Sequence, residues 1–384
     1  MHSRQLTCLK TFQETLLIMF ARLLTVSFAL GAWGVPYPAQ PACRELQIPI
    51  SISVPRFIVN ATVNDDWDAA SLTLNLTRRD STMPSDPLPI AGSTSSAVES
   101  TYMIGATVCG TGGPTLILTH GIIESKLYWH PTFEGAEMYS FIDAAVAAGY
   151  SVVSYDRIGV GSSSKVSALN DAQFQVETAV LNSLIDYARD TIHATHVGLI
   201  GHSYGSYISA ASASQKNVDS LVLTGFGGNF SYFAPFIAGA GFRVARIQNP
   251  ERWGSLDSEY LTSSDLYAET FVYYAEPHFE HRVAEWSYNV GSEPFSVAEL
   301  PSLLSTPIEY GNITAPVMVI QGQFDVSACG GNCLGLLDQT KSLFTGSKVI
   351  ETVDNLPAGH NLNLHKIAPQ AFQMILEFLA TNGV

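Results

Sequence analysis

The sequence predicts an open α/β sheet, because short apolar segments alternate with amphipathic helices along most of the chain. From residue 101 onward, seven such segments read as strands: "YMIGATV", "TLILTHG", "YSVVSYD", "HVGLIGHS", "SLVLTGF", "PVMVIQGQFD" and "KVIETVD". Continuous apolar runs of this kind are typical of strands that are buried on both faces. In residues 171–190, one helical face holds Val176, Val180, Leu181, Leu184 and Ala188. This alternation favours a mostly parallel sheet with helices on both faces.

Size and charge limit the function classes. The chain has 384 residues, 46% of them hydrophobic, so it can bury one large core with or without an insertion. Its formal net charge is -15, which argues against nucleic acid as a partner, because phosphate binding requires a basic patch. Only 14% of the residues are charged, which argues against long disordered tails.

Residues 1–34 read as a signal peptide. The apolar run "LLTVSFALGAWG" follows Arg22 and ends in small residues, as a secretory signal does, and Met19 would give such a signal a more ordinary start. A membrane anchor over residues 15–34 is the alternative, but the central Arg22 would cost several kcal/mol in a bilayer. No segment after residue 45 has the length of a spanning helix. We therefore expect a secreted protein without a stable membrane span.

Cysteines and sequons agree with export. Without Cys8, an even set of four cysteines remains, and secreted chains usually pair such a set. Cys329 and Cys333 are close enough to bridge each other, which leaves Cys43 to pair with Cys109. Four N-x-S/T sequons predict glycosylation, and they begin at Asn60, Asn75, Asn229 and Asn312.

The chain divides into four parts. After the signal, residues 35–100 contain alternating strands over 45–64, interrupted by Pro55 at a sheet edge, and a short helix over 66–77. Residues 101–226 and 315–384 form the α/β core. Residues 227–314 interrupt the alternation after the sixth strand and are rich in aromatic side chains. Insertions of this length are usually functional, so we expect a helical cap that acts as a lid; a purely structural layer is the alternative.

One pentapeptide points to nucleophilic catalysis. Gly201-His202-Ser203-Tyr204-Gly205 fits G-x-S-x-G, which places a serine on a sharp turn between a strand and a helix. Glycines are required on both sides, because a Cβ there would collide with the neighbouring strand or helix. Ser203 is the predicted nucleophile. The N–H of Tyr204 begins the following helix and can donate to an oxyanion.

The other groups that a serine nucleophile needs also follow predicted strands, whose carboxyl ends meet at one edge. The chain turns after His120, and the N–H of Ile122 can supply the second oxyanion donor, while His120 itself reads as structural. Asp325 ends a long apolar strand and is the predicted acid; Asp354 is its rival. His360 follows the last strand and is the predicted base.

Two questions remain: which histidine is the base, and whether the chain binds a metal or a phosphate. His365 is the rival of His360, but it begins the last helix and lies further from the sheet edge. A neutral imidazole takes the serine proton, and a carboxylate fixes its tautomer. A metal held by His278, His281 and Glu285 is a weak alternative to an exposed polar helix face, and "GTGGPT" precedes a strand instead of following one, so it is no phosphate loop. No cofactor is expected.

From about residue 101 onward, the chain resembles the α/β-hydrolases of the esterase–lipase type, particularly secreted fungal members. The resemblance lies in "THGIIESKLYW", "SYDRIGVGSS", "GHSYGS", "QGQFD" and "AGHN". It implies the α/β-hydrolase fold and the order serine, acid, histidine along the chain. The oxyanion position then falls on Ile122, the nucleophile on Ser203, the acid on Asp325 and the base on His360.

The predicted function is cleavage of a carboxylic ester or lactone of a small apolar substrate through an acyl-serine intermediate. Aromatic side chains are expected to line the substrate site: Trp129, Trp253 and Trp286. The same triad could cleave peptide bonds or close a ring in a small metabolite. An idle ligand-binding protein on the same fold is the alternative from another class, and fold alone cannot name a substrate.

Overall fold

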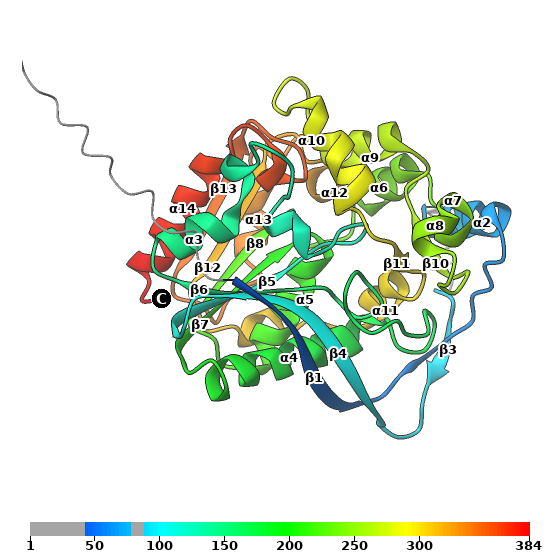
Figure 1. Cartoon of the computed structure of the whole chain (residues 1–384), viewed down its shortest axis with the longest axis horizontal. Coiled ribbons are helices and arrows are strands. Elements are labelled where there is room, and N and C mark those ends of the chain that lie inside the picture. The colour runs from blue at the N-terminus through cyan, green and yellow to red at the C-terminus, as the bar shows by residue number, and fades with distance from the viewer. Residues whose placement is uncertain (1–42, 78–87) are drawn as a thin grey trace, which may run out of the picture. The chain divides into compact units, whose positions relative to one another are not determined.

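The computed structural model describes residues 43–77 and 88–384, which include one large sheet of eight strands (Figure 1). The predicted signal peptide, residues 1–34, lies outside the described residues. In order across the sheet, the strands are β1 (Cys43–Val54), β4 (Val98–Cys109), β6 (Ser151–Tyr155), β5 (Gly113–Thr119), β7 (Ala194–His202), β8 (Ser220–Thr224), β12 (Val317–Gly322) and β13 (Ile350–Leu356).

The sheet is parallel from β6 to β13, and antiparallel only where β1 pairs with β4 and β4 with β6. This confirms the predicted mostly parallel sheet. The seven apolar segments of the sequence all form strands, and β1 lies at the edge, as the alternating pattern before Pro55 predicted. The parallel strands end at one edge, where the candidate site lies.

Helices cover both faces of the sheet, as predicted. On one face α3 (Phe141–Ala147) packs on β6 and against α14 (Ala368–Thr381). On the other, α4 (Phe174–Asp190) packs against β7 and α5 (Tyr204–Gln215), and Figure 1 shows α4 across the sheet from α3. Alanine and serine side chains of α5 are buried, so this helix packs closely behind the turn at Ser203.

The cap segment, residues 227–314, follows β8, which is the sixth strand of the large sheet along the chain. Its helices are α6 (Phe233–Ala240), α7 (Ala245–Gln248), α8 (Pro250–Trp253), α9 (Leu266–Tyr273), α10 (His281–Trp286), the π-helix η3 (Ser287–Gly291), α11 (Glu299–Ser305) and the short 3₁₀ turn η4 (Tyr310–Asn312). The expected cap was helical, but the structure adds a small sheet of β9 (Arg243–Val244), β10 (Tyr260–Thr262) and β11 (Phe295–Ser296). Strands of two or three residues are too short for a period of two to show in the sequence.

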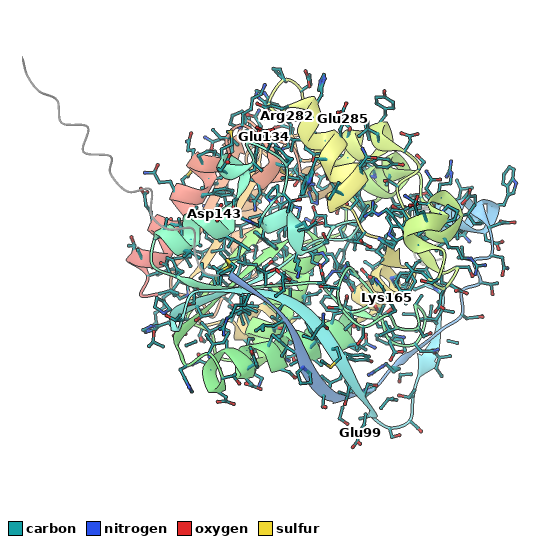
Figure 2. The ribbon with its side chains drawn as sticks, viewed as in Figure 1. Glu99, Glu134, Asp143, Lys165, Arg282 and Glu285 are labelled. Carbon is teal, nitrogen blue, oxygen red and sulfur yellow. A yellow bond between two sulfur atoms is a disulfide. The ribbon has the colours of Figure 1, made fainter. Side chains whose placement is uncertain are left out.

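The cap segment and the core are joined by polar contacts at their rim. Arg282 of α10 donates from Nη1 to the carbonyl of Glu134, 3.2 Å away, and Figure 2 shows these two residues close together at the outer end of α10. Glu134 precedes the 3₁₀ turn η2 (Glu137–Tyr139). The guanidinium of Arg282 also lies over the ring of Phe133. These contacts fix α10 above the core.

The N-terminal part behaves largely as predicted. Helix α2 spans Asp66–Thr77, which matches the predicted bounds, and β2 (Phe57–Val59) pairs with β3 (Ile90–Ser93). Both expected disulfides are present: Cys43–Cys109 joins β1 to β4, and Cys329–Cys333 closes a short loop after β12. The four sequon asparagines are exposed. In the described part of the chain, no helix combines the length and apolarity that a membrane span requires.

Candidate active site

Ser203 stands on a strained turn between β7 and α5. Its backbone has φ 53° and ψ -123°, a conformation that side chains rarely adopt. A Cβ on Gly201 would lie 2.5 Å from the Gly205 carbonyl oxygen, and one on Gly205 would lie 2.3 Å from the carbonyl oxygen of Thr119. Both positions therefore require glycine, as the G-x-S-x-G pattern predicted. The Ser203 residue remains partly accessible.

Asp325 and His360 form a buried pair at the ends of neighbouring strands. Asp325 Oδ2 lies 2.8 Å from His360 Nδ1, and Asp325 Oδ1 accepts from the Ala328 N–H at the start of α12 (Val326–Cys329). Burial alone would raise the pKa of Asp325, but His360 and these hydrogen bonds hold that pKa below its ordinary value. The carboxylate therefore stays ionised against the imidazole.

His360 lies beside Ser203 without bonding to it in this state. The His360 ring packs against the ring of His202, the residue before Ser203, with centroids 4.8 Å apart. Among the described residues, no hydrogen bond joins Ser203 Oγ to His360. Instead, Ser327 Oγ lies 3.0 Å from His360 Nδ1 and 3.3 Å from Nε2. From the cap segment, the Tyr273 ring stacks on the imidazole, with centroids 5.7 Å apart.

The turn after β5 presents the predicted oxyanion donor. The Gly121 carbonyl oxygen lies 2.8 Å from His120 Nδ1 and accepts from Arg157 Nη2 at 3.2 Å. Because a trans peptide points its C=O and N–H in opposite directions, these contacts turn the Ile122 N–H away from Arg157. In the described part of the chain, the Ile122 N–H has no acceptor. The Tyr204 N–H is likewise a free donor, because it lies in the first turn of α5.

Arg157 links this turn to both the core and the cap segment. Its Nη1 contacts Glu177 Oε1 of α4 at 2.6 Å and Glu299 Oε2 of α11 at 2.8 Å, and all three side chains are buried. The guanidinium also lies over the Tyr204 ring, 4.8 Å from its centroid. Arg157 thus contacts both halves of the predicted oxyanion hole. The hydrogen bonds within such a buried ion pair offset the free energy that is needed to remove its charges from water.

The rival and structural residues occupy other positions. His365 Nε2 accepts from the Gly359 and Ala275 N–H groups, and burial lowers the pKa of His365 to about 4, so it is a neutral structural histidine. Asp354 is only half-buried and accepts from the Gly335 N–H. His120 Nε2 accepts from the Arg157 N–H, which fits its predicted structural role.

The three tryptophans predicted to line the substrate site are buried in packing positions. Trp129 is fully buried between Tyr128 and Phe141. Trp253 packs in a separate small cluster of the cap segment with its Nε1 donating to Glu293, so it is away from Ser203. Trp286 packs on Phe133 and is 8% exposed. The cap residues against His360 are instead Tyr273 and Phe236, which sequence reasoning did not single out.

Sequence reasoning also missed a polar group around His202. Glu124 Oε2 accepts from the Gly121 N–H at 2.7 Å, and Glu124 Oε1 lies 3.4 Å from His202 Nε2. Asn361 Oδ1 lies 3.2 Å from the same nitrogen. The available signal was an acidic residue just after the oxyanion turn and an asparagine directly after His360. In the residues that the structure describes, no three His, Cys, Asp or Glu side chains gather as a metal site.

Comparisons with known proteins agree with the fold of the chain. Residues 114–282 match the model of the alpha/beta hydrolase fold family, and none of the curated proteins matches the chain. A thermostable carboxyl esterase from Bacillus coagulans is similar in structure, with a TM-score of 0.54 and 16% identity, over 73% of this chain and 95% of that one.

Two other solved structures are similar at 16% identity over 73% of this chain. They are a monoacylglycerol lipase from Paleococcus ferrophilus, with 99% of that chain covered and a TM-score of 0.51, and an enol-lactonase from Burkholderia xenovorans, with 97% covered and a TM-score of 0.50. At this identity the likeness establishes the fold, not the substrate. The strand order, the turn at Ser203 and the match over residues 114–282 together show that this chain has the α/β-hydrolase fold.

Proposed function

We propose that this protein is a serine hydrolase that cleaves a carboxylic ester or lactone. Ser203 is the nucleophile, His360 the base and Asp325 the residue that orients the base. The observation that carries this proposal is the buried Asp325–His360 pair beside a serine on a strained, glycine-flanked turn. Few arrangements other than nucleophilic catalysis require that strain.

The proposed reaction has two steps. Ser203 Oγ attacks the ester carbonyl carbon while its proton passes to His360 Nε2, and the Nδ1 contact with Asp325 keeps Nε2 free to accept it. The imidazolium then protonates the leaving alcohol, which leaves an acyl-serine. Water attacks this intermediate with His360 again acting as base, and the acid is released. The Ser203–His360 hydrogen bond forms in the substrate complex, where such bonds commonly tighten.

Negative charge develops on the carbonyl oxygen in both steps. The N–H groups of Ile122 and Tyr204 are proposed to stabilise it, each contributing about 3 kcal/mol in the transition state. Arg157 and His120 hold the peptide that carries the Ile122 N–H. This chemistry requires protein groups and water only.

The cap segment is proposed to act as a lid. Tyr273 covers the imidazole, and its hydroxyl donates to the Ile122 carbonyl oxygen at 2.6 Å, so the cap segment contacts the base and the oxyanion turn at once. A closed cap excludes water from the acyl transfer. Export fits the same proposal, because two disulfides and four exposed sequons suit an extracellular protein.

A fluorophosphonate probe and an aryl ester together test the proposal. The protein should be labelled on Ser203 and should hydrolyse p-nitrophenyl butyrate, and Ser203→Ala should abolish both. Ser214→Ala, on the same helix and half-exposed, should leave both unchanged. Labelling of Ser327, which lies nearer to His360 in this state, or activity in Ser203→Ala within about tenfold of the parent would overturn the assignment.

A further inference from the structure

Several buried polar atoms beside the nucleophile have no hydrogen-bond partner. Within the described part of the chain, they include Glu124 Oε1, Asn361 Nδ2 and the Tyr274 hydroxyl. These residues are 4%, 0% and 7% exposed. An unpaired buried donor or acceptor costs about 1–3 kcal/mol, and a charged one costs more. Groups left unpaired next to a reactive serine therefore point to a ligand that pairs them.

Glu124 is held close to Ser203 by its other oxygen. Glu124 Oε2 accepts from the Gly121 N–H, and a Cβ built on Gly121 would lie 2.8 Å from that oxygen and 2.9 Å from Ser203 Cβ. The Glu124 carboxylate and the Ser203 Cβ therefore both lie close to the same point beside Gly121. Its remaining oxygen, Oε1, can accept a hydrogen bond from a substrate.

The hydrogen-bond pattern of His202 leaves Glu124 Oε1 free. His202 Nε2 faces two acceptor oxygens, Asn361 Oδ1 and Glu124 Oε1, so the ring hydrogen on Nε2 donates to one of them. That hydrogen goes to Asn361 Oδ1 at 3.2 Å, which is nearer than Glu124 Oε1 at 3.4 Å. Because Asn361 uses its carbonyl oxygen on His202, its amide hydrogens on Nδ2 remain to donate elsewhere. The side chains of Glu124 and Asn361 therefore both lie beside His202 Nε2, where they offer an acceptor, Oε1, and a donor, Nδ2.

The cap segment contributes a third group. Tyr274 directly follows Tyr273 at the end of α9, and its ring packs between Phe279 and His365. Its hydroxyl lies near the side chains of Asn361 and Ser287. The phenol can donate and accept. It therefore lies beside the Asn361 side chain.

We propose that Glu124, Asn361 and Tyr274 form a subsite for a hydroxyl group of the substrate. The substrate O–H donates to Glu124 Oε1, and its oxygen accepts from Asn361 Nδ2, with Tyr274 as a further partner. A hydroxyl supplies one donor and one acceptor, which is the complement of this pair. An ammonium group cannot accept from the amide, and a carboxylate group is repelled by Glu124. This inference rests on the proposed esterase function and replaces the expected apolar substrate with an ester that carries a free hydroxyl.

The test compares esters that differ by one hydroxyl group. Ethyl butyrate is the plain ester, 2-hydroxyethyl butyrate carries the hydroxyl on the alcohol side, and ethyl 3-hydroxybutyrate carries it on the acyl side. We expect kcat/KM of one hydroxylated ester to exceed that of ethyl butyrate by about tenfold or more, because the unpaired site rejects the plain ester. Whichever hydroxylated ester is preferred shows whether the subsite lies on the alcohol side or on the acyl side of the ester.

Glu124→Gln is the decisive variant. The substituted amide would keep an oxygen for the Gly121 N–H and would turn the free acceptor into a donor at nearly unchanged volume, so the preference ratio should fall about tenfold. Glu285→Gln makes the same change on an exposed carboxylate of α10, labelled in Figure 2, and should leave the ratio unchanged. Tyr274→Phe, which keeps the ring packing, should lower the preference ratio severalfold. It replaces Glu124→Gln as the test if that variant does not fold.

Three outcomes would overturn the subsite. They are equal kcat/KM for all three esters in the parent protein, an unchanged ratio in folded Glu124→Gln, or, if that variant does not fold, an unchanged ratio in Tyr274→Phe. Failure of the proposed function is distinguishable, because Ser203→Ala would then retain hydrolysis of all three esters. Loss of hydrolysis in Ser203→Ala with no hydroxyl preference in the parent would keep the esterase and remove the subsite.

Discussion

At the scale of single residues, the turn at Ser203 depends on neighbouring glycines, which have no Cβ. A Cβ on Gly205 would lie 2.3 Å from the Thr119 carbonyl oxygen and 2.6 Å from that of His120, and neither backbone atom can move without shifting β5. We expect Gly205→Ala to destabilise the fold by about 2–4 kcal/mol and to abolish hydrolysis. Chemical denaturation measures the first effect. Gly311→Ala, which meets only the Thr345 hydroxyl at 3.1 Å, should cost far less; equal losses would contradict this account.

The acid of the triad can be tested against its rival in the same way. Asp325→Asn would leave a similar shape but would remove the charge that orients His360 and stabilises its protonated form. We expect kcat for an aryl ester to fall by about 10³–10⁴-fold. Asp354→Asn changes a half-buried side chain whose recorded contact is with the Gly335 N–H, so its kcat should stay within about threefold. A larger loss from Asp354→Asn than from Asp325→Asn would reverse the assignment.

At the scale of elements, the cap segment contains a buried carboxylate that does not contact the triad. Glu269 of α9 accepts from the hydroxyls of Ser263, Ser287 and Ser292. Burial raises the pKa of Glu269 to about 7, although these hydrogen bonds act in the opposite direction, and the nearby Glu124 raises it further. Glu269 is therefore a neutral acid in the folded cap segment at mildly acidic pH.

The sign of the resulting pH dependence follows from which state holds the proton. Between the ordinary glutamate pKa of 4.5 and about 7, the folded state binds a proton that the unfolded state has lost. The contribution to stability is therefore full below about pH 4.5 and decreases by about 3 kcal/mol as the pH rises through 7. Glu269→Gln should remove this dependence. Thermal denaturation of both forms at pH 5 and pH 8 measures it, and parallel pH profiles would contradict the prediction.

At the scale of the whole molecule, the two disulfides act over different distances. Cys43–Cys109 spans 66 residues and joins the edge strand β1 to the sheet, whereas Cys329–Cys333 spans 4 residues beside Asp325. Because loop entropy grows with loop length, we expect the double variant Cys43→Ser/Cys109→Ser to lose about 4 kcal/mol of unfolding free energy. Cys329→Ser/Cys333→Ser should lose less stability and more activity, since it frees α12. Urea denaturation and ester hydrolysis together check this contrast.

The amino-acid pattern alone was enough to predict the sheet, the order of its strands along the chain and the residue types at their carboxyl ends. These features are local: a buried strand needs an apolar run, and a Cβ on Gly201 would meet the Gly205 carbonyl oxygen within the same turn. Because parallel strands end at one edge, the sequence could also place Asp325 and His360 at one edge of the sheet. The helix over residues 66–77 was predictable for a similar local reason.

Which side chains from distant segments meet could be seen only in the folded chain. Trp253 packs in a separate cluster of the cap segment, and the cap residues that pack against His360 are Tyr273 and Phe236. Glu124 and Asn361 converge on His202 because β5 and β7 are neighbours in the sheet and the loop after β13 folds back over their ends. A residue pattern records what each segment buries, but not which loop reaches which strand. Loop paths depend on contacts far apart in the chain, so the polar group beside Ser203 appears only in the folded protein.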